Sequence, residues 1–194
     1  MERELLMTGI GGQGVQLGAL VLATAATSEG REVMYFGIYG GMMRGGNTDS
    51  TIVIADAPIT TPPVVARAWS AIAMHDEFWE PLEPRLRPDG VVLVNNATFA
   101  HEITASVSVH RVAATEIAAE VGNPLGGAMT MVGAYAALTE IVTLQSLIEA
   151  MRASIPSYRR QHIEANERAL RAGWDAVPLG AHPAWTTITT GAPA

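Results

Sequence analysis

The sequence predicts a single α/β domain with three layers, in which helices flank a doubly wound, largely parallel, Rossmann-like sheet. Three observations lead to this fold class. A short apolar run is followed by a glycine turn, a helical repeat and a second apolar run, which is the order of a βαβ unit. Further short β-branched runs follow, and the later part of the chain has helical periodicity. No repeat or hydrophilic linker divides the 194 residues.

The first unit is the clearest. Residues 4–8 are apolar and stop at a glycine, which predicts a strand, and the spacing of apolar residues predicts a helix over 15–28 that ends before Gly30. A second strand is expected at 32–36, paired in parallel with the first. Residues 37–48 are rich in glycine and are expected to form an irregular loop.

The rest of the chain reads as alternating strands and helices. Strands are expected at 50–54, 70–74 and 91–95, with an edge strand at 107–112, a proline-punctuated helical segment at 77–86, and helices at 115–121, 127–142 and 143–172, the last broken at Pro156 and stopped by Gly173. We expect the domain to cover residues 1–177. Residues 178–194 have no apolar period and are expected to form an extended C-terminal tail, free or laid on a partner.

Composition restricts the function. The formal charge is −7 and no basic stripe is present, which argues against binding to nucleic acid. The absence of cysteine excludes disulfides, a thiolate nucleophile and cysteine-ligated iron–sulfur clusters within this chain. The N-terminus lacks the regions of a signal peptide, and the apolar stretch 125–142 is interrupted by glycine and polar residues. We therefore expect a cytoplasmic protein outside the membrane, and the 48% hydrophobic content suggests a buried subunit.

A glycine motif joins the first strand to the first helix. Residues 9–14 have GxGxxG spacing, and backbone N–H groups at a helix start favour a phosphate. A dinucleotide enzyme would place an acid at the end of the second strand, where residues 34–37 are Met, Tyr, Phe and Gly. The simpler alternative is that these glycines only let helix and strand pack closely. The residues assigned to the anion site are Gly9, Gly11, Gly12, Gln13 and Gly14.

The second motif is the glycine and methionine loop that follows the second strand. Its single cation, Arg44, has the forked guanidinium that binds carboxylates and phosphates. The alternative is a solvated surface arginine. Ordering such a loop costs conformational entropy, so we expect a ligand or a partner subunit to offset that cost. Arg44 joins the anion site, and the expected interface residues are Tyr39, Gly40, Met42, Met43, Gly45, Gly46 and Asn47.

Other groups of polar residues predict no chemistry. Neighbours in the run 75–77 (His, Asp, Glu) point to opposite faces of a strand and cannot share one metal. The charged residues of 162–167 are typical of a solvated helix face. Serine and histidine occur without a nucleophile elbow. We therefore expect neither a catalytic residue nor a metal ligand in this chain.

Together the motifs resemble the γ subunit, or γ domain, of the pyruvate and 2-oxoglutarate ferredoxin oxidoreductase family. The resemblance extends in order over residues 4–175. It is carried by 9–15 (GIGGQGV), 39–46 (YGGMMRGG), the strand 51–54 with Pro58 and Ile59, 123–126 (NPLG) and the helix end 166–173. The loop departs from the common family form, because Gly41 and Met42 stand where Pro-Glu is usual.

The resemblance implies a non-catalytic subunit of a hetero-oligomeric, thiamine-diphosphate-dependent enzyme that converts a 2-oxo acid to an acyl-CoA. It implies α and β partner subunits, and often a ferredoxin-like subunit. Thiamine diphosphate, Mg²⁺ and [4Fe–4S] clusters would belong to these partners, and coenzyme A would be a substrate near the γ domain. The isolated chain would then have no activity. The alternative is a free-standing mononucleotide-binding module that uses the glycine turn, and an independent NAD enzyme is a third, weaker possibility.

Overall fold

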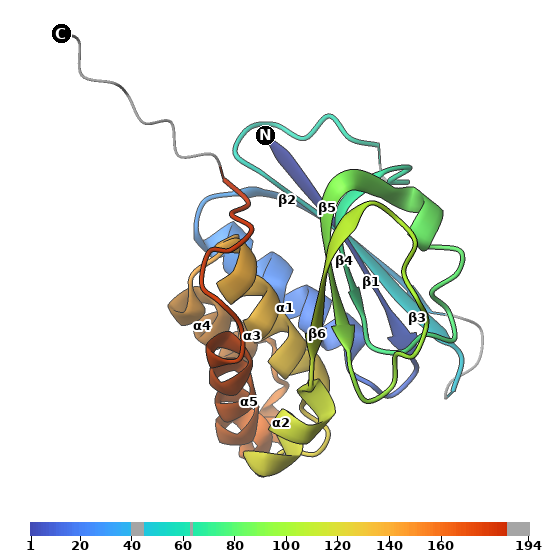
Figure 1. Ribbon diagram of the computed structural model, residues 1–194. Coiled ribbons are helices and arrows are strands. Elements are labelled where there is room, and N and C mark those ends of the chain that lie inside the picture. The colour runs from blue at the N-terminus through green and yellow to red at the C-terminus, as the bar shows by residue number, and fades with distance from the viewer. Residues whose placement is uncertain (40–44, 63, 186–194) are drawn as a thin grey trace, which may run out of the picture.

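The computed structural model describes residues 1–39, 45–62 and 64–185, which form a six-stranded mixed sheet with helices on one face (Figure 1). The strands are β1 (Glu2–Ile10), β2 (Glu32–Tyr39), β3 (Asn47–Ala55), β4 (Ala68–Ala73), β5 (Leu86–Asn95) and β6 (Val107–Val112), in the order β2-β3-β1-β4-β5-β6. The helices are α1 (Val15–Ser28), α2 (Ala114–Glu120), α3 (Gly127–Thr139), α4 (Leu144–Ser154) and α5 (Ile163–Asp175), with the 3₁₀ helices η1 (Glu83–Arg85) and η2 (Ser157–His162). Within the described ranges, no helix has both the length and the apolar character needed to cross a membrane.

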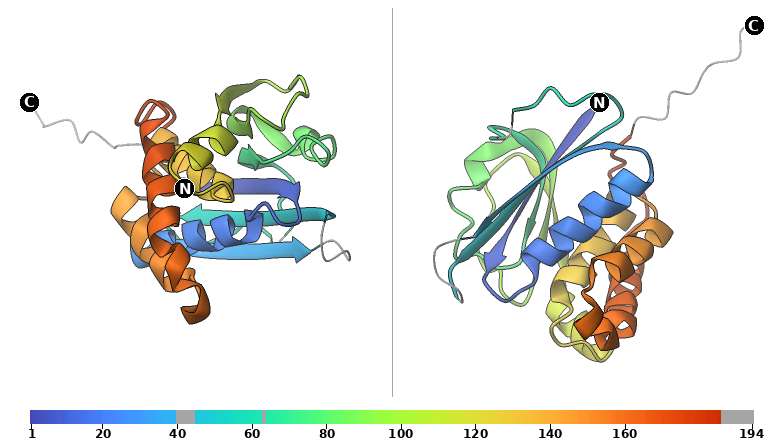
Figure 2. Two further views of the ribbon diagram at one scale, coloured as in Figure 1. Left: turned by 90° about the horizontal axis from the view of Figure 1, so that it is seen from below. Right: turned by 180° about the vertical axis from the view of Figure 1, so that it is seen from behind.

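Two hydrophobic cores lie on the two faces of the sheet, because successive strand side chains point to opposite sides. On β1, Leu5 and Met7 pack in the core under the helices, and Leu6 packs in the other core. Helices α1 and α3 contact the sheet, while α4 and α5 form a further layer on them. Figures 1 and 2 show all five α-helices on the same side of the sheet. The predicted α/β class with a single domain is confirmed. The described α-helices cover one face of the sheet instead of flanking it on both faces, as the doubly wound arrangement would require.

The predicted parallel pairing of the first two strands is wrong. Strand β3 lies between them and pairs antiparallel with both β1 and β2, whereas β1, β4, β5 and β6 are parallel neighbours. The two strands within residues 32–55 therefore form a hairpin. Residues 37–39 and 47–48 belong to its strands, although an irregular loop was predicted over 37–48. Apolar runs alone do not specify which strands pair, and a direct return along the same sheet needs no crossover helix.

The second face of the sheet is covered mostly by irregular segments. The predicted helix at 77–86 is present only as the short η1, since Pro81 and Pro84 lack the N–H that a helix interior requires. Trp79 is fully buried and meets Phe99 edge-to-face, with ring centroids 5.3 Å apart. These two aromatic rings supply the bulk that a helix would otherwise provide.

Helices α3 and α5 cross at two glycines. The predicted stop at Gly173 is wrong, because α5 continues to Asp175. A Cβ on Gly173 would lie 1.9 Å from the carbonyl oxygen of Thr130, and a Cβ on Gly133 would lie 2.1 Å from that of Leu170. The missing side chains thus let the two backbones touch. Gly173 is needed for packing rather than for ending the helix.

The first part of the predicted tail lies on the end of α3. The N–H groups of Gly180, His182 and Ala184 donate to the carbonyls of residues 137, 138 and 139 at 2.8, 2.9 and 2.6 Å. These are carbonyls that a helix end leaves without partners. The guanidinium of Arg31 stacks on the ring of Trp185, with its Cζ 4.0 Å from the ring centroid. Residues 180–185 are thus attached to the domain, and the division of the chain at residue 177 stays a prediction.

Candidate functional site

The glycine turn connects β1 to α1 in a conformation that most side chains would not adopt. Gly12 and Gly14 have φ values of 109° and 83°, in the region that favours glycine. The side chain of Gln13 holds the turn: its Oε1 accepts from the N–H of Ile10 at 2.8 Å and its Nε2 donates to the carbonyl of Met74 at 3.4 Å. Gln13 is therefore a structural residue of the turn.

Close packing explains Gly9. A Cβ there would lie within 3 Å of Gln13 Oε1, Met74 Cβ and Val15 Cγ2. The alternative that the glycines serve only packing therefore holds for this position. It does not hold for Gly12, since a Cβ built there meets nothing within 4 Å and its φ alone favours glycine.

The turn and the β2–β3 hairpin meet directly. The N–H of Gly11 donates to the carbonyl of Gly46 at 2.8 Å, so two motifs 35 positions apart in the chain lie side by side. Asn47, which begins β3, donates from Nδ2 to Asp49 Oδ2 at 2.8 Å. Tyr39 ends β2 with its backbone opposite Thr48. The predicted Gly40, Met42, Met43 and Arg44 lie outside the described residues.

Gln16, in the first turn of α1, ties the helix to the hairpin. Its Nε2 donates to the carbonyls of Ile38 at 3.2 Å and Asp49 at 2.7 Å, and its Oε1 accepts from the hydroxyl of Tyr35 at 2.7 Å. The side chain thus makes three hydrogen bonds to two strands. No sequence pattern marks this residue, because its partners, two backbone carbonyls and the Tyr35 hydroxyl, come together only in the folded chain.

A groove of about 490 Å³ opens at the N-terminal end of α1. One wall is the turn and the first helical residues, including Gly12, Gly14 and Leu17, and the other is the junction of α4, η2 and α5. The remaining lining residues are Gln16, Leu20, Tyr35, Asn123, Leu125, Ser154, Ile155, Pro156, Arg159, His162 and Asn166. Of the predicted anion-site residues that the structure describes, Gly12 and Gly14 line the groove, whereas Gly9, Gly11 and Gln13 support the turn behind it.

Two late motifs meet at the far wall of this groove. Asn123 donates from Nδ2 to Asn166 Oδ1 at 3.1 Å, and the carbonyl of Asn123 accepts from the N–H of Gly126 at 2.7 Å. The asparagine pair joins the segment before α3 to α5. Both stretches carry the family resemblance noted in the sequence, and the structure brings them together beside the glycine turn.

The groove favours an anion. The first N–H groups of an α-helix lack partners inside the helix and carry its positive dipole end, and α1 has no acidic residue in its first turn. Arg159 adds a guanidinium from the opposite wall. Leu17, Leu20 and Ile155 add apolar side chains to the lining. An arrangement of this kind suits a ligand with a phosphate and an apolar portion.

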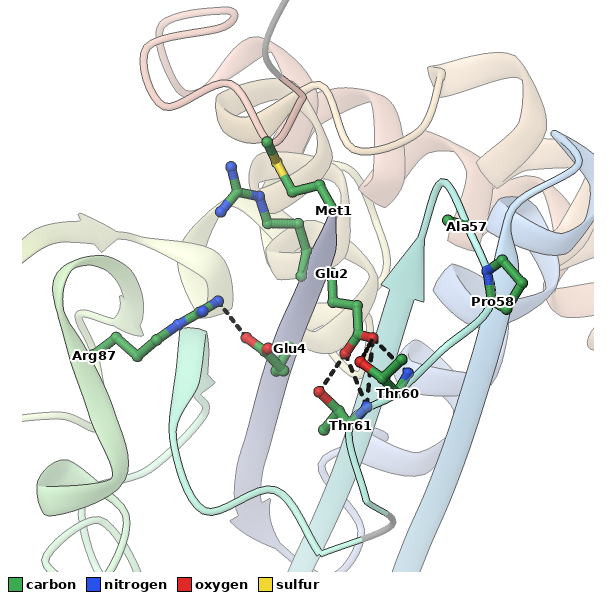
Figure 3. Close-up of a pocket in the computed structure, with 9 residues that line it drawn as sticks. Met1, Glu2, Glu4, Ala57, Pro58, Thr60, Thr61 and Arg87 are labelled. Carbon is green, nitrogen blue, oxygen red and sulfur yellow. Dashed lines mark hydrogen bonds and ion pairs between the residues drawn. The ribbon is translucent and has the colours of Figure 1, made fainter.

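A second hollow, of about 600 Å³, lies at the N-terminal end of β1 (Figure 3). The Glu2 carboxylate accepts from both the N–H groups and the hydroxyls of Thr60 and Thr61. The Thr61 hydroxyl, followed by the groups of Thr60, lowers the pKa of Glu2 from 4.5 to about 2. Glu4 is buried and accepts from Arg87 at 2.5 Å. Both carboxylates are satisfied internally, which indicates a structural role.

The described residues contain no group of three or more His, Asp or Glu side chains placed to share a metal ion. His75 Nδ1 lies 3.2 Å from Asp76 Oδ1, and the backbone N–H of Glu77 donates to the same Nδ1 at 3.1 Å. These three residues therefore interact locally instead of converging on a shared site.

Comparison with known proteins places the chain among oxidoreductase subunits. Residues 4–176 match the family profile described as pyruvate ferredoxin/flavodoxin oxidoreductase. The 2-oxoglutarate synthase subunit KorC of Methanocaldococcus jannaschii is 30% identical over an alignment that covers 80% of this chain and 85% of KorC. The pyruvate synthase subunit PorC of Methanothermobacter marburgensis is 32% identical over an alignment that covers 79% of this chain and 86% of PorC.

Solved structures share the fold. A pyruvate oxidoreductase subunit PORC from Thermotoga maritima superposes with a TM-score of 0.73 at 25% identity, covering 92% of this chain and 98% of the other. A keto/oxoacid ferredoxin oxidoreductase γ subunit from Geobacter sulfurreducens superposes with a TM-score of 0.78 at 24% identity, covering 91% and 96%. At that identity the second likeness concerns the fold alone.

Proposed function

Because the chain belongs to the pyruvate ferredoxin/flavodoxin oxidoreductase family, we propose that it is the γ subunit of a multi-subunit 2-oxoacid oxidoreductase. The observation that carries the proposal is the match over residues 4–176, which runs from within β1 to the end of α5. The KorC and PorC subunits compared above are similar in length to this chain, since the match covers 85% and 86% of their lengths. The chain therefore works as one subunit among several.

The chemistry of the complex is carried by its partners. In this proposal α and β subunits hold thiamine diphosphate with Mg²⁺ and perform decarboxylation, and [4Fe–4S] clusters in partner chains carry electrons to ferredoxin or another acceptor. This chain supplies no cysteine for such clusters. Its contribution is binding and assembly in the cytoplasm.

The groove at the start of α1 is the proposed coenzyme A side of the assembled site. A phosphate fits the helix N–H groups beside Gly12 and Gly14, and Arg159 lies across the groove from them. The apolar residues Leu17, Leu20 and Ile155 suit the uncharged part of the same substrate. Gly46, two positions after Arg44 in the sequence, accepts a hydrogen bond from Gly11 of the same turn, and on this basis we include Arg44 in the proposed site.

The test uses the complex assembled from co-expressed subunits. A charge-assisted hydrogen bond contributes about 1.5–3 kcal/mol, so Arg159→Ala should raise the KM for coenzyme A by roughly 10-fold to 100-fold. Arg44→Ala should act in the same direction. The control is Arg67→Ala, which removes an exposed arginine outside the groove and should leave this KM unchanged. Normal coenzyme A kinetics in both site variants would remove the groove from the proposal and leave the subunit assignment intact.

A further inference from the structure

The edge strand β2 exposes apolar side chains on the face of the sheet opposite the helices. Val33 and Tyr35 pack against the core under the helices, and Met34 packs against the other core. Phe36 and Ile38 continue the side of Met34, yet they are 52% and 50% exposed. The covering segments of this face thus stop before the end of β2.

A hollow of about 170 Å³ lies beside these side chains. Phe36 and Ile38 form one wall, and Val64, which is 79% exposed, belongs to the other. The remaining lining residues are Leu6, Met7, Asp49, Ser50, Thr51, Val65, Leu82 and Arg85. We call Phe36, Ile38 and Val64 together the β2 apolar face. A cluster of exposed apolar side chains around a hollow is typical of an interaction surface.

The floor of the hollow contains a carboxylate that is only half satisfied. Asp49 Oδ2 accepts from Asn47, but Asp49 Oδ1 is buried and has no hydrogen-bond partner among the described residues. Thr8 stands opposite Asp49 in the β1–β3 register, is fully buried, and its hydroxyl likewise lacks a partner among those residues. Buried oxygen atoms without a donor are costly. Among the described lining residues the one cation is Arg85, which donates to the carbonyl of Val65 at 2.8 Å.

We propose that the β2 apolar face docks a partner subunit of the oxidoreductase, and that the partner inserts a lysine or arginine side chain between Ile38 and Val64 toward Asp49. The aliphatic stem of such a side chain suits the apolar walls, and its charged head supplies the donor that Asp49 Oδ1 lacks. The inference rests on the proposed subunit role and adds the place of contact and the chemistry of the partner.

A second copy of this chain fits the surface poorly. A symmetric dimer through the β2 apolar face would bring the same patch of both copies together. Two Asp49 carboxylates would then approach each other, and the Arg85 of each copy already donates to the carbonyl of Val65. Charge complementarity therefore favours a different, basic segment as the occupant.

The first experiment compares variants within the co-expressed complex. Ile38→Glu places a charge in the docking surface and should lower the fraction of this chain retained in the complex at least 10-fold. Asp49→Asn removes the charge without changing the size, and should weaken retention less while reducing its dependence on salt. The matched control is Val109→Glu on β6, the other edge strand, where the side chain is 39% exposed. Val109 is on the same sheet face as Val107, which packs in the core away from the helices.

Each variant is first checked for an unchanged thermal midpoint as an isolated chain, so that loss of assembly is separated from loss of folding. Retention of Ile38→Glu at the wild-type level would overturn the docking site while leaving the subunit role standing. If wild-type chain itself fails to assemble, the proposed function is the claim that fails.

The second experiment identifies the occupant. Phe36 is replaced by the photocrosslinker p-benzoylphenylalanine, and the complex is irradiated and digested. The expected product joins position 36 to a partner peptide that contains lysine or arginine. Crosslinks confined to this chain's own residues 40–44, or to a second copy, would overturn the proposal.

Discussion

Gly11 donates its backbone N–H to the carbonyl of Gly46 at 2.8 Å, and this contact joins the glycine turn to the residue that directly precedes β3. A Cβ on Gly11 would lie 3.4 Å from the N atom of Gly45 and 3.5 Å from the oxygen of Gly46. The glycine turn is thus in direct contact with Gly45 and Gly46, the described end of the second motif. Its position at the start of α1 explains how the hairpin and the groove can serve the same assembled site.

Gln16 should be the main side-chain link between α1 and the β2–β3 hairpin. Gln16→Ala removes two bonds to the carbonyls of Ile38 and Asp49 and one from Tyr35, and should lower the free energy of unfolding by about 1–3 kcal/mol. Denaturant unfolding measures the change. Gln145→Ala is the control, since Gln145 is exposed and bonds only to Glu149 on its own helix. Equal stability of the two variants would show that the link contributes nothing.

The crossing of α3 and α5 should tolerate no side chain. Gly133→Ala places a Cβ 2.1 Å from the oxygen of Leu170, so the helices must separate and we expect destabilisation by about 3 kcal/mol. Thermal unfolding provides the measurement. Gly30→Asn is the matched control, because its φ of 77° is one that asparagine accepts and nothing lies within 4 Å. A wild-type midpoint for Gly133→Ala would contradict the close crossing.

Stability at low pH should depend on Glu2. Its pKa falls from 4.5 to about 2 in the folded chain, chiefly through the hydroxyl of Thr61. A depressed folded pKa gives stabilisation that is present above pH 4.5 and is lost as the pH falls toward 2. Glu2→Gln should therefore flatten the pH dependence of the thermal midpoint in that window. Parallel profiles for wild type and variant would refute this role.

Residues 180–185 should behave as part of the domain. Trp185→Ala removes the stacking partner of Arg31 and the Nε1 bond to the carbonyl of Ile141 at 3.2 Å, so residues 180–185 should detach from the end of α3 more often. We expect faster hydrogen exchange for the amides of Gly180, His182 and Ala184, which donate to the last carbonyls of α3. Leu179→Ala, at a site 61% exposed, is the control and should leave those rates unchanged. Unchanged rates in the Trp185 variant would mean that the segment only rests on the domain.

Local sequence patterns predicted the elements better than their pairing. Helix α1 begins at Val15 and ends at Ser28 as expected, because a glycine turn and apolar periodicity define both ends. The insertion of β3 between β1 and β2 was missed, since strand pairing depends on contacts far apart in the chain. Gly173 was misread for the same reason: its partner is Thr130 on another helix. Arg159 was also missed, because nothing in its sequence neighbourhood marks the groove that folding creates.

We expect this chain to act as one subunit of a 2-oxoacid oxidoreductase and to perform no oxidation alone. The most direct measurement is affinity purification of the tagged chain from its native cells, with identification of the bound proteins and assay of coenzyme A-dependent 2-oxo acid oxidation. We expect thiamine-dependent α and β chains to co-purify with activity, and the chain separated from them to be inactive. A monomer that carries a bound nucleotide and no partners, or oxidation of a 2-oxo acid by the pure chain, would contradict the account.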